Sequence, residues 1–546
     1  TVQVIWPRGE MQLLRNVHAD QVLTLYQSQA KDKGAWLIPQ MDAATWLFAN
    51  VTDSLSSVTF HHQGDKSFID FARQPLIPHM VSTDAPRIAI GDVNNDGLED
   101  FYICGGKFQP GVLYIQQPNG QFFPSFQPAF QDDSTCMDED ACFVDVNHDG
   151  YPDLYVVSGG GEFYNHMKPL LDRVYLNDGH GHFIKDTAAL PPMYENKSCV
   201  AVADVNGDGY PDLFVGGRAD AMDYGTIPQS YLLVNDGHGH FRDETDQLAP
   251  GLKHIGLVTD AIWTDFNEDG KPDLIVVGEW MPITFFQNMG NGHLKNVTRQ
   301  MGLEYTNGWW RRIVAADLDG DGKMDYVVGN YGLNSKLRPS RQYPIKLFIG
   351  DLDNNSVNDI ILAYARNGKY YPFLGRDELA AQMPAIITRK YPDYHAFASK
   401  TVDELFGSAI HHAKVWKAYL FNSVWLHHVG NQKFDIIPLP IAAQVAPAQA
   451  FDVGDFNRDG HPDILVGGNF YGTLPAEGRY DANDGLLLLG DGKGHFTPEW
   501  PWQTGFYVSG EVRDVKTIHR ASDSLIMVSR YNDRILFFKV HPLTRK

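Results

Sequence analysis

The residues with the clearest chemistry are aspartates and asparagines that recur at fixed spacing in short acidic loops. Seven segments follow the pattern Asp-x-Asn/Asp-x-Asp-Gly-x-x-Asp, with departures in one of them. Positions 1, 3, 5 and 9 offer side-chain oxygens, and position 7 can offer its backbone carbonyl. Roughly six to eight such oxygens suit Ca²⁺, and the glycine at position 6 permits the positive φ that a loop around an ion needs. The pattern therefore predicts calcium loops.

The candidate metal ligands stand at positions 1, 3, 5 and 9 of each loop. In chain order they are Asp92, Asn94, Asp96 and Asp100; Asp145, Asn147, Asp149 and Asp153; Asp204, Asn206, Asp208 and Asp212; Asp265, Asn267, Asp269 and Asp273; Asp317, Asp319, Asp321 and Asp325; Asp351, Asp353, Asn355 and Asp359; Asp455, Asn457, Asp459 and Asp463. We expect about six or seven Ca²⁺ ions. In the sixth loop Asn355 replaces the aspartate and Ser356 replaces the glycine, so its metal binding stays open. An EF-hand does not fit, because that motif needs a later glutamate and flanking helices.

The charge and composition of the chain restrict its partners. The formal net charge is -22, which excludes nucleic acid as a partner because phosphate binding needs clustered Lys and Arg. Clustered carboxylates repel one another without metal, so we expect folding and calcium binding to be coupled. No apolar stretch reaches the length of about 20 residues that a membrane span needs. The four cysteines match no zinc spacing; Cys136 and Cys142 are near enough in sequence for a small disulfide loop, and the pairing stays open.

Short strands must hold these loops. Each acidic loop follows an apolar run, such as residues 87–91, and precedes a β-branched one, which indicates strand, loop and strand. A second turn, Asn177-Asp-Gly-His-Gly-His-Phe183, recurs at Asn235–Phe241 and in looser copies, and predicts hairpins between a third and a fourth strand. Four antiparallel strands in each repeat are typical of a propeller blade.

The predicted fold class is all-β: a seven-bladed β-propeller, with eight blades as the alternative, and Ca²⁺ loops between strands 1 and 2 of most blades. We assign residues 1–50 to a small β-domain and linker, and residues 51–546 to the propeller with a helical insertion at 376–418. The segment 351–438 is the candidate for an eighth blade. The last repeat lacks a fourth strand, which Ser57–His62 would supply to close the ring. Within the small domain, alternating residues predict strands that include Gln21–Tyr26.

The acidic loops followed by Asp-Leu-Phe-Val-Gly-Gly resemble the FG-GAP or VCBS repeats of integrin-α-type propellers, over about residues 85–540. The N-terminal Trp6-Pro-Arg-Gly-Glu, together with the phrases at 16–17 and 21–25, resembles the ASPIC/UnbV module that accompanies such propellers in secreted proteins. Two phrases, Val277-Gly-Glu-Trp-Met-Pro-Ile and Gly478-Arg-Tyr-Asp-Ala, resemble large surface proteins of Bacteroidota.

These resemblances imply an extracellular or cell-surface protein, outer-membrane-associated and non-enzymatic, with Ca²⁺ in the loops between strands one and two. The chain begins at Thr1 without a leader, so we expect any signal peptide to have been removed. The ASPIC/UnbV module usually follows a propeller in this family. Its position at the start implies that the chain is the later part of a longer polypeptide.

The face opposite the calcium loops is the predicted partner surface. Connections between strands two and three, and between blades, carry many aromatic residues, for example at 160–166, 221–224 and 308–312. Aromatic and Arg side chains dominate binding hot spots, and aromatics can also stack on sugar rings; packing of the propeller mouth is the alternative. The candidate partner-binding residues are Trp280, Trp309, Trp310, Arg311, Arg312, Tyr331, Arg479 and Tyr480. We expect a protein or glycan partner on the cell surface.

Two functional classes fit the sequence. We expect a binding or scaffold module, because no Ser-His-Asp order, zinc motif or phosphate loop is present. The alternative is a polysaccharide-active enzyme, a lyase or hydrolase, whose carboxylates would come from Glu279, Asp377 and Glu378. Two carboxylates in one cleft, one with a raised pKa, would favour the enzyme.

Overall fold

The computed structural model describes residues 2–6, 10–30, 32–33 and 46–541, apart from residues 66, 431 and 476. Its contacts divide the chain into two compact units, Thr1–Trp46 and Leu47–Lys546. Each unit is described by itself below.

The first unit contains an antiparallel sheet in the order β1-β2-β3. Its elements are β1 (Val2–Ile5), β2 (Glu10–Leu14), η1 (Gln27–Gln29) and β3 (Asp32–Lys33). The strand predicted at Gln21–Tyr26 is absent: Val22 there is 94% exposed, and Asp32–Lys33 pairs with β2 instead. Part of the ASPIC/UnbV-like phrase, Pro7, Arg8 and Gly9, lies outside the described residues, as does most of the predicted linker.

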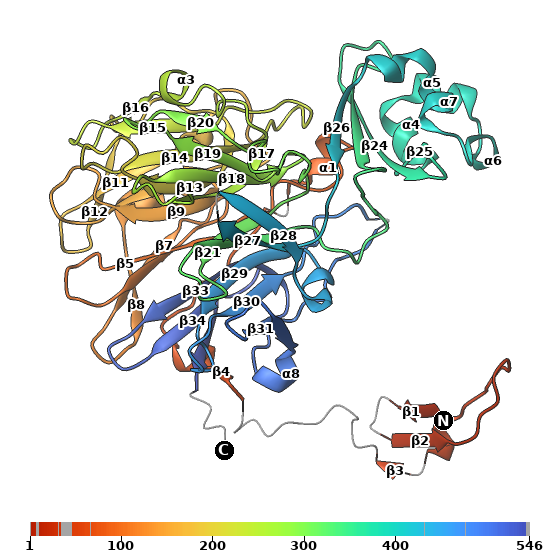
Figure 1. Cartoon of the computed structure of the whole chain (residues 1–546), viewed down its shortest axis with the longest axis horizontal. Helices are drawn as coiled ribbons and strands as arrows, with labels where there is room; N and C mark the ends of the chain where they lie inside the picture. The colour runs from red at the N-terminus through yellow and green to blue at the C-terminus, as the bar shows by residue number, and fades with distance from the viewer. Residues whose placement is uncertain are drawn as a thin grey trace. The chain divides into compact units, whose positions relative to one another are not determined.

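Seven four-stranded antiparallel sheets make up a ring in the second unit (Figure 1). The first strand of each sheet contacts the first strand of the next, and β33 of the seventh sheet contacts β5 of the first, which closes the ring. Radially repeated four-stranded sheets define a β-propeller. We call these sheets blades one to seven. Their second strands are apolar and buried, as in β14, because each blade packs between two neighbours.

The strands of the first four blades follow one another without interruption. They are β5 (Ile88–Gly91), β6 (Asp100–Ile103), β7 (Val112–Gln116) and β8 (Phe122–Ser125) in blade one; β9 (Asp138–Val144), β10 (Asp153–Ser158), β11 (Arg173–Asn177) and β12 (Phe183–Asp186) in blade two; β13 (Asn196–Ala203), β14 (Asp212–Ala219), β15 (Tyr231–Asn235) and β16 (Phe241–Asp243) in blade three; and β17 (Leu257–Thr264), β18 (Asp273–Glu279), β19 (Thr284–Asn288) and β20 (Leu294–Asn296) in blade four. The hairpins predicted at 177–183 and 235–241 are confirmed as turns between third and fourth strands.

The last three blades include one interruption and one closure. They are β21 (Arg312–Ala316), β22 (Asp325–Gly329), β27 (Val424–Gly430) and β28 (Lys433–Pro438) in blade five; β29 (Ala448–Gly454), β30 (Asp463–Gly468), β31 (Leu486–Gly490) and β32 (Phe496–Glu499) in blade six; and β33 (Glu511–His519), β34 (Ser524–Tyr531), β35 (Leu536–Val540) and β4 (Phe48–Asn50) in blade seven. The remaining short elements of the ring are η3 (Thr52–Ser54), α1 (Asp70–Arg73), α2 (Pro128–Asp132), η4 (Lys168–Leu170), α3 (Thr245–Leu248), η6 (Ile441–Gln444) and α8 (Pro501–Thr504).

The ring is closed by a strand from near the N-terminus, but not by the one the sequence predicts. Strand β4 pairs antiparallel with β35, with Phe48 opposite Val540. Residues 57–62 were the predicted partner, and they contribute only an isolated bridge between His61 and Arg534. Phe48 is fully buried against neighbouring apolar side chains, which explains why this short segment occupies the fourth position. Strand β4 thus lies in the second unit, although the sequence assigns it to the N-terminal domain.

An eighth four-stranded sheet interrupts blade five between β22 and β27. Its order is β25-β24-β23-β26, and Figure 1 shows it beside the ring rather than within it. Its elements are β23 (Ile345–Gly350), β24 (Asp359–Arg366), β25 (Lys369–Pro372), α4 (Arg376–Gln382), α5 (Pro384–Lys390), α6 (Tyr394–Phe397), α7 (Val402–Phe406), η5 (Gly407–His412) and β26 (Lys414–Ala418). The predicted helical insertion is therefore present. It carries a sheet of its own, and this sheet lies outside the ring, whereas an eighth blade would lie within it.

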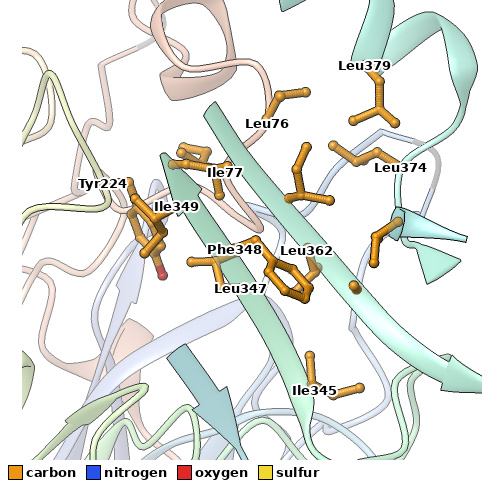
Figure 2. Packing of buried hydrophobic residues seen from close by; sticks show 14 of the residues in the cluster. Leu76, Ile77, Tyr224, Ile345, Leu347, Phe348, Ile349, Leu362, Leu374 and Leu379 are labelled. Atoms are coloured by element: carbon orange, nitrogen blue, oxygen red, sulfur yellow. The ribbon is translucent and has the colours of Figure 1, made fainter. Parts of the chain in front are cut away.

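The inserted sheet packs on the ring through an apolar cluster. Leu347 and Ile349 of β23 lie near Tyr224 and near Ile77 of the segment after α1, and Leu374 and Leu379 extend the cluster toward α4 (Figure 2). These side chains are almost fully buried. Burial of apolar surface, at roughly 25 cal/mol per Å², therefore holds the insertion against one face of the propeller.

Two features of the described residues bear on the predictions from composition. None of the helices there has the length and hydrophobicity that crossing a bilayer requires. Cys104, Cys136, Cys142 and Cys199 are all free, so Cys136 and Cys142 do not form the small disulfide loop.

Replacing Phe48 tests the closure of the ring. We expect Phe48→Ala to lower the free energy of unfolding by about 3–5 kcal/mol, because it leaves a cavity beside β35. Chemical denaturation followed by far-UV circular dichroism measures the change. Phe126, which is 74% exposed, provides the matched control, and Phe126→Ala should change stability by less than about 0.5 kcal/mol. Equal effects of the two substitutions would contradict the closure by β4.

Candidate metal loops and the opposite face

The acidic loops occupy equivalent positions in the fold. Six of them join the first and second strands of blades one to six, and the loop that begins at Asp351 joins β23 and β24 of the inserted sheet. In blade seven the equivalent connection, residues 520–523, lacks the pattern. Because strands alternate in direction, the six ring loops lie on one face, together with the hairpins between third and fourth strands.

The seven loops share one backbone conformation. Position 4 has a positive φ in every loop: Asn95, His148, Gly207, Glu268, Gly320, Asn354 and Arg458. Position 6 does too: Gly97, Gly150, Gly209, Gly270, Gly322, Ser356 and Gly460. Ser356 adopts a φ of 68°, although such values are uncommon outside glycine. The sixth loop therefore keeps the conformation of the others despite its altered sequence.

The aspartate at position 9 ties each of the six ring loops to the third strand of its blade. In blade three, one Asp212 oxygen accepts a hydrogen bond from the Val205 amide at 3.0 Å, and the other accepts from the Asn235 amide at 2.9 Å. The Asn235 side chain in turn donates to the Val146 carbonyl of blade two at 2.9 Å. This chain of bonds links the loop, the third strand and the loop of the preceding blade.

Burial raises the pKa of several position-9 carboxyl groups above the ordinary value for aspartate. It raises the pKa of Asp100 and Asp273 to about 7 and that of Asp153 and Asp212 to about 6, against the lowering effect of the backbone hydrogen bonds. Aspartates at positions 1 and 5 of the same loops raise these values further by repulsion. A bound cation would oppose both effects, because it favours the charged carboxylate.

The donor set of the loops fits a hard divalent cation. Ligand oxygens of Asp317, Asp319 and Asp325 lie within 4.8 Å of one another, and so do those of Asp351, Asp353 and the buried Asp359. One oxygen of Asp353 is buried without a hydrogen-bond partner. In the other five loops asparagine holds position 3, and it can contribute a neutral oxygen. Oxygen-only ligands of this kind are typical of Ca²⁺ sites.

Most of the predicted partner-binding residues are buried. The exposed fractions are 6% for Trp280, 1% for Trp309, 0% for Trp310, 4% for Arg311, 8% for Arg312 and 2% for Tyr331. Only Arg479 is exposed, and Tyr480 is half-buried. The six buried side chains pack the propeller mouth, which was the alternative interpretation, and cannot form a contact surface for a partner.

A segment crosses the mouth of the propeller on this face, and its residues Leu76, Ile77 and Val81 share an apolar cluster with Trp280, Trp309 and Tyr331. We call residues 67–86 the axial plug. Arg73 donates to the Gly161 carbonyl of the blade-two connection at 2.6 Å, and the Met80 amide donates to Gly472 in blade six at 2.7 Å. In the sequence, nothing in residues 67–86 predicts this course. The plug fills the space that the predicted partner would use.

A cluster of buried charges joins the plug to the blades. Glu279 lies 2.9 Å from Arg218, 3.0 Å from Arg311 and 3.1 Å from His79 of the plug, and it accepts a hydrogen bond from the Tyr224 hydroxyl. Burial opposes the charge on Glu279, but Arg218, His79 and Arg311 outweigh it and hold its pKa well below the ordinary value. Glu279 is thus an electrostatic anchor of the mouth and is not accessible to a substrate.

Two clefts among the described residues of the second unit bear on the predicted sites. One, of about 380 Å³, lies between the connections of blades two and three, where the sequence predicts aromatic loops at 160–166 and 221–224. The other, of about 250 Å³, lies between the insertion and the ring and is lined by Glu378 and Glu477. Burial raises the pKa of Glu477 to about 7. Asp377, by contrast, pairs with Arg376 on the surface of α4, so the predicted trio of carboxylates does not come together.

Comparison with known proteins identifies the class of repeat. Residues 92–156, 145–215 and 265–328 match the FG-GAP-like repeat, and these stretches include the first five acidic loops. Together with the ring of four-stranded sheets, the match defines a β-propeller with FG-GAP-like repeats.

Similarity to individual proteins is partial. The chain is 26% identical over 225 residues to cartilage acidic protein 1 of Mus musculus, covering 39% of this chain and 32% of that one. It is 26% identical over 184 residues to human integrin alpha-IIb, covering 30% and 18%, and 25% identical over 248 residues to phosphatidylinositol-glycan-specific phospholipase D of Bos taurus, covering 42% and 27%. The chain thus spans no more than 32% of the length of these relatives.

Similarity to solved structures is weaker. The V. cholerae biofilm matrix protein Bap1 has a TM-score of 0.34 at 12% identity, with 85% of this chain and 88% of that chain covered. The Dos1 propeller has a TM-score of 0.36 at 8% identity, with 84% and 93% covered. Scores of this size carry no argument about function.

Removing Glu279 tests the buried charge cluster. We expect Glu279→Ala to lower the free energy of unfolding by about 3–5 kcal/mol, because Arg218 and Arg311 would stay buried without their counter-charge. Urea denaturation measures the change, and Glu304→Ala, at an exposed position, serves as the control. A stability loss below about 1 kcal/mol would show that the cluster does not anchor the plug.

Proposed function

We propose that this chain is a calcium-stabilised, seven-bladed propeller that acts as a non-enzymatic binding scaffold outside the cell. The observation that carries the proposal is the shared conformation of the acidic loops, with left-handed residues at positions 4 and 6 in all seven. A conformation kept in seven sequences, at the cost of non-glycine residues with positive φ, points to a common ligand. Among cations, Ca²⁺ suits a flexible loop with oxygen donors only.

The residues that would hold the ions are those at positions 1, 3, 5 and 9. In blade three these are Asp204, Asn206, Asp208 and Asp212. When bound, Ca²⁺ would supply positive charge that stabilises the loop. The Asp204 carboxylate also accepts hydrogen bonds from the amides of Gly207, Asp208 and Gly209, which fix the turn of the loop. We include the sixth loop among the sites, for a total of seven.

The scaffold role and the location rest on similarity. FG-GAP-like repeats and a partial match to an integrin alpha chain favour a propeller that binds other proteins. The ASPIC/UnbV-like phrase and the phrases typical of Bacteroidota surface proteins favour a secreted protein at the outer membrane. We propose a protein or a glycan of the cell surface as the partner.

Matched substitutions in one loop test the calcium part of this proposal. We expect Ca²⁺ to raise the free energy of unfolding, by about 2.7 kcal/mol for each site when its concentration is a hundredfold above Kd. Asp208→Asn removes a charge from an exposed position, so it should lower the stability gain from Ca²⁺ and leave stability in EDTA unchanged. Asp212→Asn should cost about 1–3 kcal/mol even in EDTA, because an amide nitrogen would face a backbone amide.

Thermal and urea denaturation of the wild type and both variants, each in CaCl₂ and in EDTA, provide the measurement. If EDTA left the wild-type transition unchanged, calcium would have no structural role here. If Asp208→Asn and Asp212→Asn behaved alike in EDTA, the separate role of position 9 would be wrong.

A second candidate is a polysaccharide-active enzyme, a lyase or hydrolase. It is favoured by the cleft of about 250 Å³ that both Glu378 and Glu477 line, where burial raises the pKa of Glu477 to about 7. Two carboxyl groups that flank the scissile bond are the pair that glycoside hydrolysis uses, and one relative of this chain is named as a phospholipase. Hydrolysis of reducing-end-labelled polysaccharides by the wild type, abolished in Glu477→Gln, would support the enzyme. If the wild type released no product from these polysaccharides, the enzyme hypothesis would be wrong.

A further inference from the structure

The cleft between blades two and three has the form of a small-molecule site. Its volume of about 380 Å³ lies within the range of roughly 300–1,000 Å³ that ligand pockets occupy. It opens on the face opposite the ring's acidic loops, because its walls are connections between second and third strands and between blades. Six of its lining residues carry the argument: Tyr164, His166, Tyr194, Glu195, Asn196 and Met222.

The walls of this cleft are held in place from behind. The Lys197 ammonium group, which is fully buried, donates to the carbonyls of Leu170 at 2.6 Å and Glu195 at 2.7 Å. It thereby joins the floor from blade two to the connection that leads into blade three. Buried hydrogen bonds of this kind keep a site in its binding conformation, which lowers the entropy that a ligand must overcome.

The rim of the cleft is fixed by the axial plug. Arg73 donates to the carbonyls of Gly161 and Glu162 on one side, and Gln74 donates to the Ala221 carbonyl on the other at 3.0 Å. Two loops that belong to different blades are therefore tied to one segment. The plug, which closes the axis, also shapes the cleft beside it.

The lining combines aromatic rings with planar polar groups. Tyr164 is 39% exposed, and the His166 ring packs edge-on against Tyr194 with centroids 4.8 Å apart. Asn196 also lines the cleft; it is only 5% exposed, and its side-chain nitrogen has no hydrogen-bond partner among the described residues. A buried donor without a partner costs free energy, so a ligand hydroxyl or carbonyl that accepted from it would be favoured.

The charges at the cleft select against acidic ligands. Glu195 and Asp220 line it, with His166 and His254 as the ionisable bases, and none of its described lining residues is lysine or arginine. Phosphates, sulfates and uronic acids would meet these carboxylates there. The Arg73 guanidinium, 5.2 Å from the centre of the Tyr164 ring, already donates to the carbonyls of Gly161 and Glu162. An extended peptide is also disfavoured, because loops form the walls and no open strand edge is offered for pairing.

We propose that this cleft binds one unit of a neutral saccharide. The apolar C–H face of a pyranose would lie on Tyr164, and its hydroxyls would pair with Asn196 and Glu195. Glu195 already accepts from the Tyr231 hydroxyl, which orients its carboxylate. This assignment rests on the proposed scaffold function and names the chemistry of its partner: an uncharged glycan.

Saturation-transfer NMR and calorimetric titration of the full chain in CaCl₂ test the assignment. The probes are methyl glycosides of glucose, galactose, mannose and N-acetylglucosamine, with methyl glucuronide as the acidic comparison. We expect at least one neutral glycoside to bind and methyl glucuronide not to bind. Tyr164→Ala should weaken binding at least fivefold, as expected for loss of an aromatic contact of about 1 kcal/mol. Met222→Trp, at a rim residue that is 52% exposed, should fill the cleft and abolish binding.

Tyr343→Ala is the matched control, because Tyr343 is 40% exposed and lies away from the cleft. It should bind like the wild type. Binding by none of the neutral glycosides, preference for the glucuronide, or equal binding by Tyr164→Ala and Tyr343→Ala would overturn the saccharide site. Capture of unmodified peptides in competition with the glycosides would overturn it in favour of a protein ligand. None of these outcomes affects the response of stability to calcium, so failure here is distinct from failure of the calcium scaffold.

Discussion

The structure depends on a buried aspartate that each acidic loop repeats at position 9. In blade three, Asp212 is fully buried and accepts one backbone hydrogen bond from its own loop and one from the third strand of its blade. The neighbouring asparagine extends the link to the preceding blade. A buried carboxylate is costly unless it is paired with a charge or hydrogen-bonded. Here backbone amides donate the hydrogen bonds and, in our proposal, a bound cation supplies the opposite charge. One residue type therefore joins metal binding, blade geometry and contact between blades.

Much of this organisation can be predicted from the sequence, because it repeats. The acidic loops, the hairpins at 177–183 and 235–241 and the helical insertion follow from local patterns whose chemistry acts within a few residues. The conformation of Ser356 could not be predicted, because its positive φ is imposed by the surrounding loop. The closing strand Phe48–Asn50 was also missed, because a short apolar segment pairs with β35 only once the ring has brought the two chain ends together.

The candidate partner site is a second feature that could not be predicted from local sequence patterns, because tertiary contacts decide which of its residues are exposed. Aromatic residues in connections between strands predict a binding face, yet Trp309 and Trp310 are buried. Trp309 packs against His79 of the axial plug, whose sequence carries no repeat and no motif, and Trp310 packs between blades four and five. The plug is held by long-range contacts such as the ion pair between Asp84 and Arg218. Because the mouth is buried, the cleft between blades two and three is the better candidate for a binding site. Aromatic residues of the same kind of loop reach solvent there.

We propose that the acidic loops, including the one in the inserted sheet, are equivalent calcium sites. Anomalous diffraction from crystals grown in CaCl₂ tests it most directly, because it locates each ion without reference to stability. We expect an anomalous peak in every loop, seven in all, with the peak in the Asp351 loop bounded by Asp351, Asp353 and Asp359. Loops without anomalous density at saturating calcium would contradict it.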